Sequence, residues 1–160
     1  MNIKNVLRTL KKSSGVGIYS KNGLHLVANT SLLLTLTDDE LWDVQYGLKL
    51  RETNAWYQEA WGRSKRFDKT NKPFPKNALA IIDKAKSTDS VDLVDTRLSD
   101  GAVRYLSREN CYTVIDIEYF NLFKQIIAMK QSAYGPETPL LINGTHVLTP
   151  VRHETSKWMK

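Results

Sequence analysis

The 160-residue chain contains one cysteine, Cys111, so it has neither a disulfide framework nor a cysteine-based zinc cluster. Its three histidines are too scattered along the chain to form a local metal motif. No apolar run approaches the length of a membrane span, and the N-terminal segment is amphipathic rather than a signal peptide. We therefore expect a cytoplasmic protein that has no membrane partner and binds no metal or cofactor.

Signals of catalysis are also scarce. Gly15-Val16-Gly17 lacks the third glycine and the following helix of a phosphate-binding loop. Asp116 and Glu118 could hold Mg²⁺ if they lay on one face of a strand, as in a nuclease. The same two carboxylates suit a helix start, where they would cap free backbone amides, and the apolar periodicity changes at this point. We therefore predict no catalytic residue and keep a Mg-dependent nuclease using Asp116 and Glu118 as an alternative.

Positive charge exceeds negative charge by six, and the pI is about 9.4, which favours a polyanionic partner. Residues 2–12 form the first basic segment, a predicted helix with one apolar face and no acidic residue. Cations along one helix can follow a phosphate backbone, although such a row can also be a solvated face. The cations of this segment are Lys4, Arg8, Lys11 and Lys12.

A second basic segment follows two tryptophans, Trp56 and Trp61. Alternating aromatic and cationic side chains are typical of proteins that bind single-stranded nucleic acid. Tryptophans in a small domain more often fill the core, so packing is the competing interpretation. The cations of this segment are Arg63, Lys65, Arg66, Lys69, Lys72 and Lys76.

Three dipeptides predict tight turns between strands: Asn22-Gly23, Asp100-Gly101 and Asn143-Gly144. Asn-Gly and Asp-Gly suit two-residue hairpin loops, because the turn needs positive φ angles. The predicted hairpins join residues 16–20 to 24–29, 91–96 to 102–107, and 140–142 to 145–151. Residues 31–37 are leucine-rich and predict a further strand.

Helices are predicted from caps and apolar spacing. Thr37 and Glu40 form a capping-box pattern, and residues 76–86 predict a short helix. A strand over residues 112–117 should lead into a helix that ends before Gly135-Pro136. Its apolar face would comprise Tyr119, Leu122, Phe123, Ile126, Ile127 and Lys130. Together these elements predict an α+β fold, an antiparallel sheet with helices packed on one face.

The C-terminal third resembles the end of a bacterial-type DNA sliding clamp, the β processivity factor of replicative polymerases. Residues 115–124 resemble the strand-to-helix segment of that family, and residues 138–142 and 147–152 resemble its last two strands. Residues 6–12 and 23–30 resemble its first helix and the strand that follows. The resemblance implies a single clamp-like domain over residues 1–152, with a divergent middle segment at about 42–76 and a tail at 153–160.

The resemblance further implies a non-enzymatic DNA-replication accessory that contacts the DNA backbone non-specifically. A ring would need several copies, so it implies a homo-oligomer, and a phage-encoded single-domain relative is one form of it. Helix residues facing DNA would be Lys4, Arg8, Lys11, Lys12, Lys124 and Lys130, joined by Arg63, Lys65 and Arg66 of the second basic segment. A DNA polymerase or other replication protein would contact Val147, Thr149, Pro150, Val151 and Arg152. The alternatives are an inhibitor or decoy of the host replication machinery, and a single-stranded nucleic-acid-binding protein.

Overall fold

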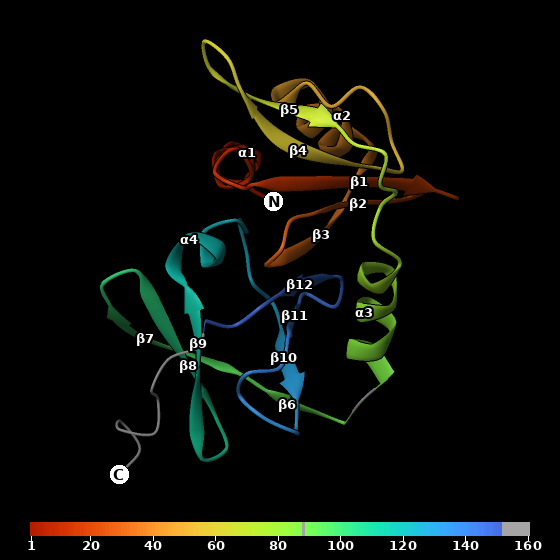
Figure 1. The fold of residues 1–160 in the computed structure, drawn as a ribbon. Coiled ribbons are helices and arrows are strands. Elements are labelled where there is room, and N and C mark those ends of the chain that lie inside the picture. The colour runs from red at the N-terminus through yellow and green to blue at the C-terminus, as the bar shows by residue number, and fades with distance from the viewer. Residues whose placement is uncertain (88, 152–160) are drawn as a thin grey trace. The chain divides into compact units, whose positions relative to one another are not determined.

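The computed structural model describes residues 1–87 and 89–151, in which four helices and twelve strands form an α+β fold (Figure 1). The strand pairings within each unit are antiparallel, so the predicted α+β class is confirmed. The chain divides into two compact units, Met1–Ala80 (unit 1) and Ile81–Lys160 (unit 2), and each is described by itself. The prediction of one clamp-like domain over residues 1–152 stays a prediction, and the expected tail at 153–160 lies outside the described residues. None of the helices in the described ranges has the length and apolar character needed to span a bilayer.

Unit 1 is built on five strands with the neighbour order β5-β4-β1-β2-β3. Helix α2 packs on β2 and β3, and α1 packs against α2. The predicted turn at Asn22-Gly23 is present with φ angles of 53° and 78°. The elements are α1 (Ile3–Lys11), β1 (Gly15–Lys21), β2 (Leu24–Ala28), β3 (Leu32–Leu36), α2 (Asp38–Leu48), β4 (Ala55–Trp61) and β5 (Lys65–Lys69).

The capping box predicted at Thr37 starts α2. The Thr37 side chain accepts a hydrogen bond from the Glu40 amide at 3.2 Å, and the Glu40 carboxylate accepts one from the Thr37 amide at 2.9 Å. Two amide groups at the start of the helix are satisfied in this way. Gly47, near the other end of α2, lets the two helices approach closely. A Cβ atom at Gly47 would lie 2.7 Å from a methyl group of Leu7 on α1.

The two faces of the unit 1 sheet are filled differently. Ile18 and Val27 are opposite each other in the register and fully buried, on the face that also carries His25. On the other face the Trp56 indole covers Gly17. A Cβ atom there would lie 2.8 Å from the indole. Trp56 therefore serves packing, as the competing interpretation of the second basic segment predicts.

Unit 2 contains two groups of strands. Their neighbour orders are β12-β11-β10-β6 and β7-β8-β9. The turn residues Asn143 and Gly144 have φ angles of 52° and 75°, and Gly101 has 59°, as the turn dipeptides predict. The elements are β6 (Ser90–Asp92), β7 (Val94–Asp100), β8 (Val103–Arg108), β9 (Cys111–Asp116), α4 (Ile117–Phe120), β10 (Met129–Ser132), β11 (Leu140–Ile142) and β12 (His146–Leu148), with α3 (Lys76–Ser87) spanning the boundary between the units.

The helix predicted to start at Asp116 or Glu118 and to end before Gly135-Pro136 is wrong beyond its first turn. Helix α4 ends at Phe120, and Lys130 lies on strand β10 instead. The Asn143 side chain accepts hydrogen bonds from the amides of Ile127 and Ala128 at 2.7 and 3.2 Å, which holds this segment in a non-helical path. Strand β10 then pairs with β11 and β6. Strand β6 is distant in sequence, and helical spacing of apolar residues carries no information on strand partners, so the sequence did not reveal this pairing.

A buried arginine anchors the segment after β10. The Arg108 guanidinium, whose residue is 8% exposed, donates to the Gln131 side chain at 2.6 Å and to the Gly135 carbonyl at 2.8 Å. It also donates to the carbonyls of Ser132 and Ala133 at 3.0 and 3.3 Å. The positive charge is therefore satisfied by neutral oxygen atoms, which stabilises it in a buried position.

Candidate functional site

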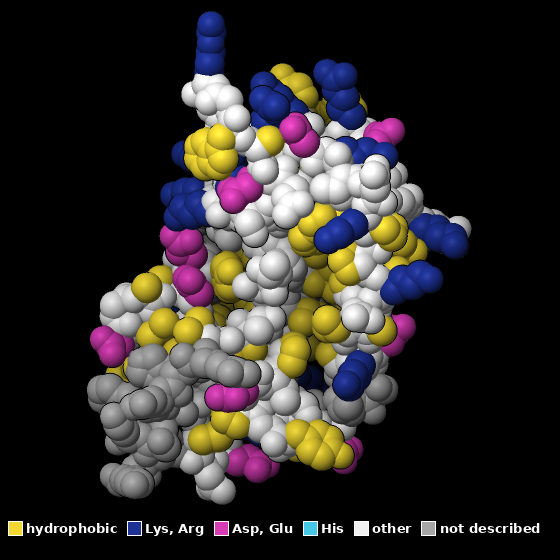
Figure 2. All heavy atoms as spheres, in the orientation of Figure 1, with side chains coloured by type: hydrophobic (Ala, Val, Ile, Leu, Met, Phe, Trp, Pro, Cys, Tyr) yellow, Lys and Arg dark blue, Asp and Glu magenta, His cyan; other side chains and the backbone are white. Residues whose placement is uncertain are grey.

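The excess positive charge of the chain belongs entirely to unit 1. Residues 1–80 contain 13 lysines and arginines and 7 acidic residues, whereas residues 81–160 contain 10 of each. Figure 2 shows many of these basic side chains over the part of the molecule formed by α1, α2, β4 and β5. A site for a polyanion is therefore to be sought in unit 1.

A hollow of about 780 Å³ lies in unit 1, bordered by the C-terminal ends of α1 and α2 and by the β4–β5 hairpin. We call it the basic hollow, because six of its ten described lining residues are cationic and none of the ten is acidic. The lining consists of Lys11, Gly47, Leu48, Lys49, Arg51, Arg63, Ser64, Lys65, Arg66 and Phe67.

The β4–β5 hairpin is tied to the end of α1 by two hydrogen bonds. The Lys65 ammonium donates to the Ser13 carbonyl at 2.7 Å, and the Glu59 amide donates to the Ser14 carbonyl at 2.8 Å. Ser13 and Ser14 directly follow α1. The tie therefore brings Lys11, in the last turn of α1, to the same hollow as the hairpin residues.

The segment after α2 presents two cations around a buried leucine. Leu50 is 1% exposed, and its amide and carbonyl bond to Gln45 at 2.9 and 3.1 Å. The buried Tyr57 hydroxyl holds the next residues by bonding to both the amide and the carbonyl of Glu52. Lys49 and Arg51 flank Leu50 and are exposed, and both line the basic hollow.

Two of the six cations are already paired with carboxylates. Lys65 lies 3.2 Å from Glu59, and Arg66 donates two hydrogen bonds to Asp68 at 3.0 and 3.4 Å. The hydrogen bond and the charge of Asp68 raise the pKa of the Arg66 guanidinium above its ordinary value. Within the described part of the chain, four cations of the hollow have no carboxylate at ion-pair distance: Lys11, Lys49, Arg51 and Arg63.

Helix dipoles explain only part of this cluster. Lys11 and Lys49 lie at the C-terminal ends of α1 and α2, where positive charge is favourable without any ligand. Arg51 lies three residues past the end of α2, and Arg63 lies in the loop of the β4–β5 hairpin. Local helix electrostatics gives no reason for these two arginines to line the same hollow.

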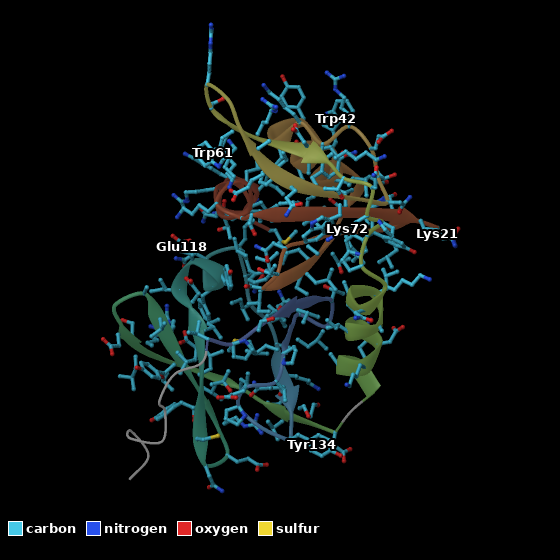
Figure 3. All side chains as sticks on the ribbon, in the orientation of Figure 1. Lys21, Trp42, Trp61, Lys72, Glu118 and Tyr134 are labelled. Carbon is cyan, nitrogen blue, oxygen red and sulfur yellow. The ribbon has the colours of Figure 1, made fainter. Side chains whose placement is uncertain are left out.

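Aromatic groups accompany the cations of the hairpin. Phe67 is half-buried in the hollow, and the Lys65 ammonium lies 5.2 Å from its ring centre. Trp61 ends β4 and is 71% exposed, in contrast to the packed Trp56. Figure 3 shows Trp61 beside the hairpin, on the side of unit 1 away from Lys21 and Lys72.

The structure brings together only part of the predicted DNA-contacting residues. Lys11, Arg63, Lys65 and Arg66 line the basic hollow, whereas Lys4, Arg8 and Lys12 are exposed elsewhere on or beside α1. Lys124 and Lys130 belong to unit 2, and neither lies on a helix. The pair of DNA-facing helices implied by the clamp resemblance is therefore not formed by these residues.

The predicted partner-binding strand is largely inaccessible. Val147 and Pro150 are buried, and Thr149 is exposed. The Val151 amide donates to the Val114 carbonyl at 2.8 Å. Arg152 lies outside the described residues. Contact with a partner protein at this strand stays a prediction.

A polar relay that the sequence did not reveal links Ser20, His25 and Asp38. The Ser20 hydroxyl lies 2.7 Å from His25 Nδ1, and Asp38 lies 2.5 Å from His25 Nε2. Serine hydrolases hold the serine at Nε2 and the acid at Nδ1, the reverse of this order. The Ser20 amide and carbonyl are both bonded to Asn54, and the Asp38 side chain is 93% exposed. The relay therefore suits a link between the β1–β2 hairpin and α2 better than catalysis.

Asp116, one of the two carboxylates considered for a nuclease, caps helix α4. Asp116 accepts a hydrogen bond from the Glu118 amide at 2.8 Å, which confirms the capping interpretation. Among the residues the structure describes, no group of three or more histidine, cysteine or acidic side chains is placed to hold a metal ion.

Comparison of the chain with family models, with curated proteins and with solved structures found no match. The resemblance to a sliding clamp therefore stays a prediction. The cationic lining of the basic hollow is the feature of unit 1 that indicates a function.

Proposed function

We propose that the protein binds the phosphate backbone of nucleic acid, without cleaving it, through the basic hollow of unit 1. The observation that carries this proposal is the convergence of four cations without carboxylate partners: Lys11, Lys49, Arg51 and Arg63. They come from three segments of the chain. Each would release counterions on contact with a phosphate, which is the main source of non-specific affinity for nucleic acids.

The layout of the hollow favours a polymer over a single small anion. Its cations are spread over the end of α1, the segment after α2 and the β4–β5 loop, around about 780 Å³ of open space. A small anion could reach only a few of them at once, whereas successive phosphates of a backbone could meet them all.

The same layout favours contact that is independent of base sequence. Sequence is read by donors and acceptors held in fixed directions against base edges. Lys49, Arg51 and Arg63 are exposed, and within the described residues no side-chain partner holds their charged groups in one orientation. Long, exposed cationic side chains of this kind suit phosphates, because a phosphate accepts hydrogen bonds from many directions.

The resemblance of the terminal segments to a sliding clamp supports a role as a DNA-replication accessory. In that role the protein would hold nucleic acid for a polymerase and would itself carry out no reaction. The basic hollow would supply the backbone contact, in place of the second helix that the clamp resemblance implies.

Fluorescence anisotropy with a labelled 20-nucleotide DNA at about 50 mM salt tests this proposal. The hollow variant K11Q/K49Q/R51Q/R63Q removes the four unpaired cations. The control variant K4Q/K21Q/K72Q/K76Q removes four exposed lysines of unit 1 outside the hollow, so the two variants have equal net charge. Circular dichroism should confirm that both variants are folded.

We expect the hollow variant to lose affinity by about tenfold or more and the control variant to lose about threefold or less. Equal losses in the two variants would mean that net charge, rather than the hollow, determines binding. No binding by the unaltered protein would refute the proposal outright.

A further inference from the structure

We infer that the basic hollow takes single-stranded nucleic acid, with Trp61 as the surface on which a base stacks. This inference rests on the proposed function and adds to it the strandedness of the ligand and an aromatic contact. Trp61 ends β4 and is 71% exposed.

The strand register places Trp61 beside the hollow. Trp61 is the direct cross-strand partner of Lys65, so the two side chains leave the hairpin on the same face. Lys65 lines the hollow, and so does Arg63 in the three-residue loop between the two strands. Arg63 is two residues from Trp61, so a nucleotide whose phosphate meets Arg63 would have its base within reach of the Trp61 indole.

Exposure alone does not distinguish Trp61, because Trp42 on α2 is also 69% exposed. The surroundings of the two indoles differ in charge. Trp42 is adjacent in sequence to Asp43 and lies one helical turn from Asp38 and Asp39. Trp61 has one acidic neighbour on its strand, Glu59, which is paired with Lys65 at 3.2 Å, and it is followed by the cations Arg63 and Arg66. Acidic neighbours repel a phosphate backbone and basic neighbours attract it.

An exposed indole beside cations suits a single strand better than a duplex. In a duplex the bases are paired and stacked on each other, so an indole outside the backbone meets only sugar and phosphate. In a single strand each base has a face that can stack on an aromatic side chain, and this contact tolerates any sequence. The combination therefore fits the sequence-independent backbone contact proposed above.

The test compares Trp61→Ala with Trp42→Ala, which removes an equally exposed indole from unit 1. The ligands are oligo-dT and oligo-U of 12 nucleotides, a 12-base-pair duplex, and heparin as a polyanion without bases. We expect Trp61→Ala to weaken oligonucleotide binding by about five- to tenfold and to leave duplex and heparin binding within about twofold. Trp42→Ala should bind all four ligands as the unaltered protein does, and Trp61→Phe should restore most of the lost affinity. The ratio of oligo-dT to oligo-U affinity assigns DNA or RNA, and tighter binding of either one than of the duplex supports a single strand.

The inference and the proposed function fail in different ways. If the hollow variant loses oligonucleotide binding while Trp61→Ala and Trp42→Ala behave alike, the stacking role is overturned and backbone binding stands. Equal weakening of oligonucleotide, duplex and heparin binding by Trp61→Ala would also overturn stacking. If the unaltered protein binds none of the three nucleic acids, the proposed function is overturned as well.

Discussion

The slope of binding affinity against salt concentration should show how many cations of the basic hollow contact phosphates. For single strands, the logarithm of the binding constant falls with the logarithm of salt concentration by about 0.7 for each phosphate contacted. If all four unpaired cations of the hollow make such a contact, the slope should be about −3. Raising the salt from 50 to 200 mM should then lower the affinity about 50-fold.

The four cations should contribute more to this slope than the two paired ones. Lys65 and Arg66 already have Glu59 and Asp68 within 3.2 and 3.0 Å. Their charges are compensated before any ligand arrives, so they release fewer counterions on binding.

Arg63→Gln is the sharpest single perturbation. Arg63 lies in the exposed loop of the β4–β5 hairpin and has no ion-pair partner among the described residues, so its loss should not disturb the fold. Lys21→Gln is the matched control, because Lys21 is an exposed cation of unit 1 that does not line the hollow. Anisotropy titrations at four salt concentrations should show the slope reduced by about 0.7 in Arg63→Gln and unchanged in Lys21→Gln. Equal slopes in both variants, or a hollow variant with the slope of the unaltered protein, would refute the reasoning.

Three further predictions concern stability and chemistry. Arg108→Met should lower the free energy of unfolding by about 3 kcal/mol, because four oxygen atoms lose a charged donor in a buried site; denaturant titration measures this. Gly17→Val should cost about 2 kcal/mol in the same assay, because a Cβ atom would lie 2.8 Å from the Trp56 indole. A fluorophosphonate probe should leave Ser20 unlabelled, because the reversed relay and the bonded Ser20 backbone offer no hydrolase geometry.

Each of these predictions has a control. Arg104→Met removes a partly buried ion pair with Asp95, whose side chains are 21% and 26% exposed, and a contact with the Phe120 ring. It should cost about 1–2 kcal/mol, so an equal loss in Arg108→Met would contradict the anchoring role. A Cβ atom at Gly135 would meet nothing within 4 Å, so Gly135→Ala should be nearly neutral. Labelling of the unaltered protein that disappears in Ser20→Ala would show that the relay is a catalytic site.

Local turn and cap chemistry was readable from the sequence, whereas partners from distant segments were not. Asn22-Gly23 and Asn143-Gly144 form the predicted turns, because Asn and Gly tolerate positive φ at low cost. The β4–β5 hairpin was missed, since Gly62-Arg63-Ser64 is not one of the common turn dipeptides. The long helix after Asp116 was wrong, because hydrogen bonds to Asn143 outweigh the helical spacing in that segment.

The candidate site was partly predictable for the same reason. Both basic segments were recognised from composition. Of the first segment only Lys11 lines the basic hollow, because hydrogen bonds from the hairpin to Ser13 and Ser14 hold the end of α1 beside the hairpin. Lys49 and Arg51 were missed. A signal was present in Lys49-Leu50-Arg51, where a leucine between two cations just after a capped helix indicates one buried and two exposed side chains.

The most direct measurement is ultraviolet cross-linking of the unaltered 160-residue protein to oligo-dT, with the linked peptides identified by mass spectrometry. We predict cross-links within residues 47–67, concentrated at Trp61 and Phe67, which heparin competes away. Cross-links confined to residues 81–151 would contradict the basic hollow as the binding site.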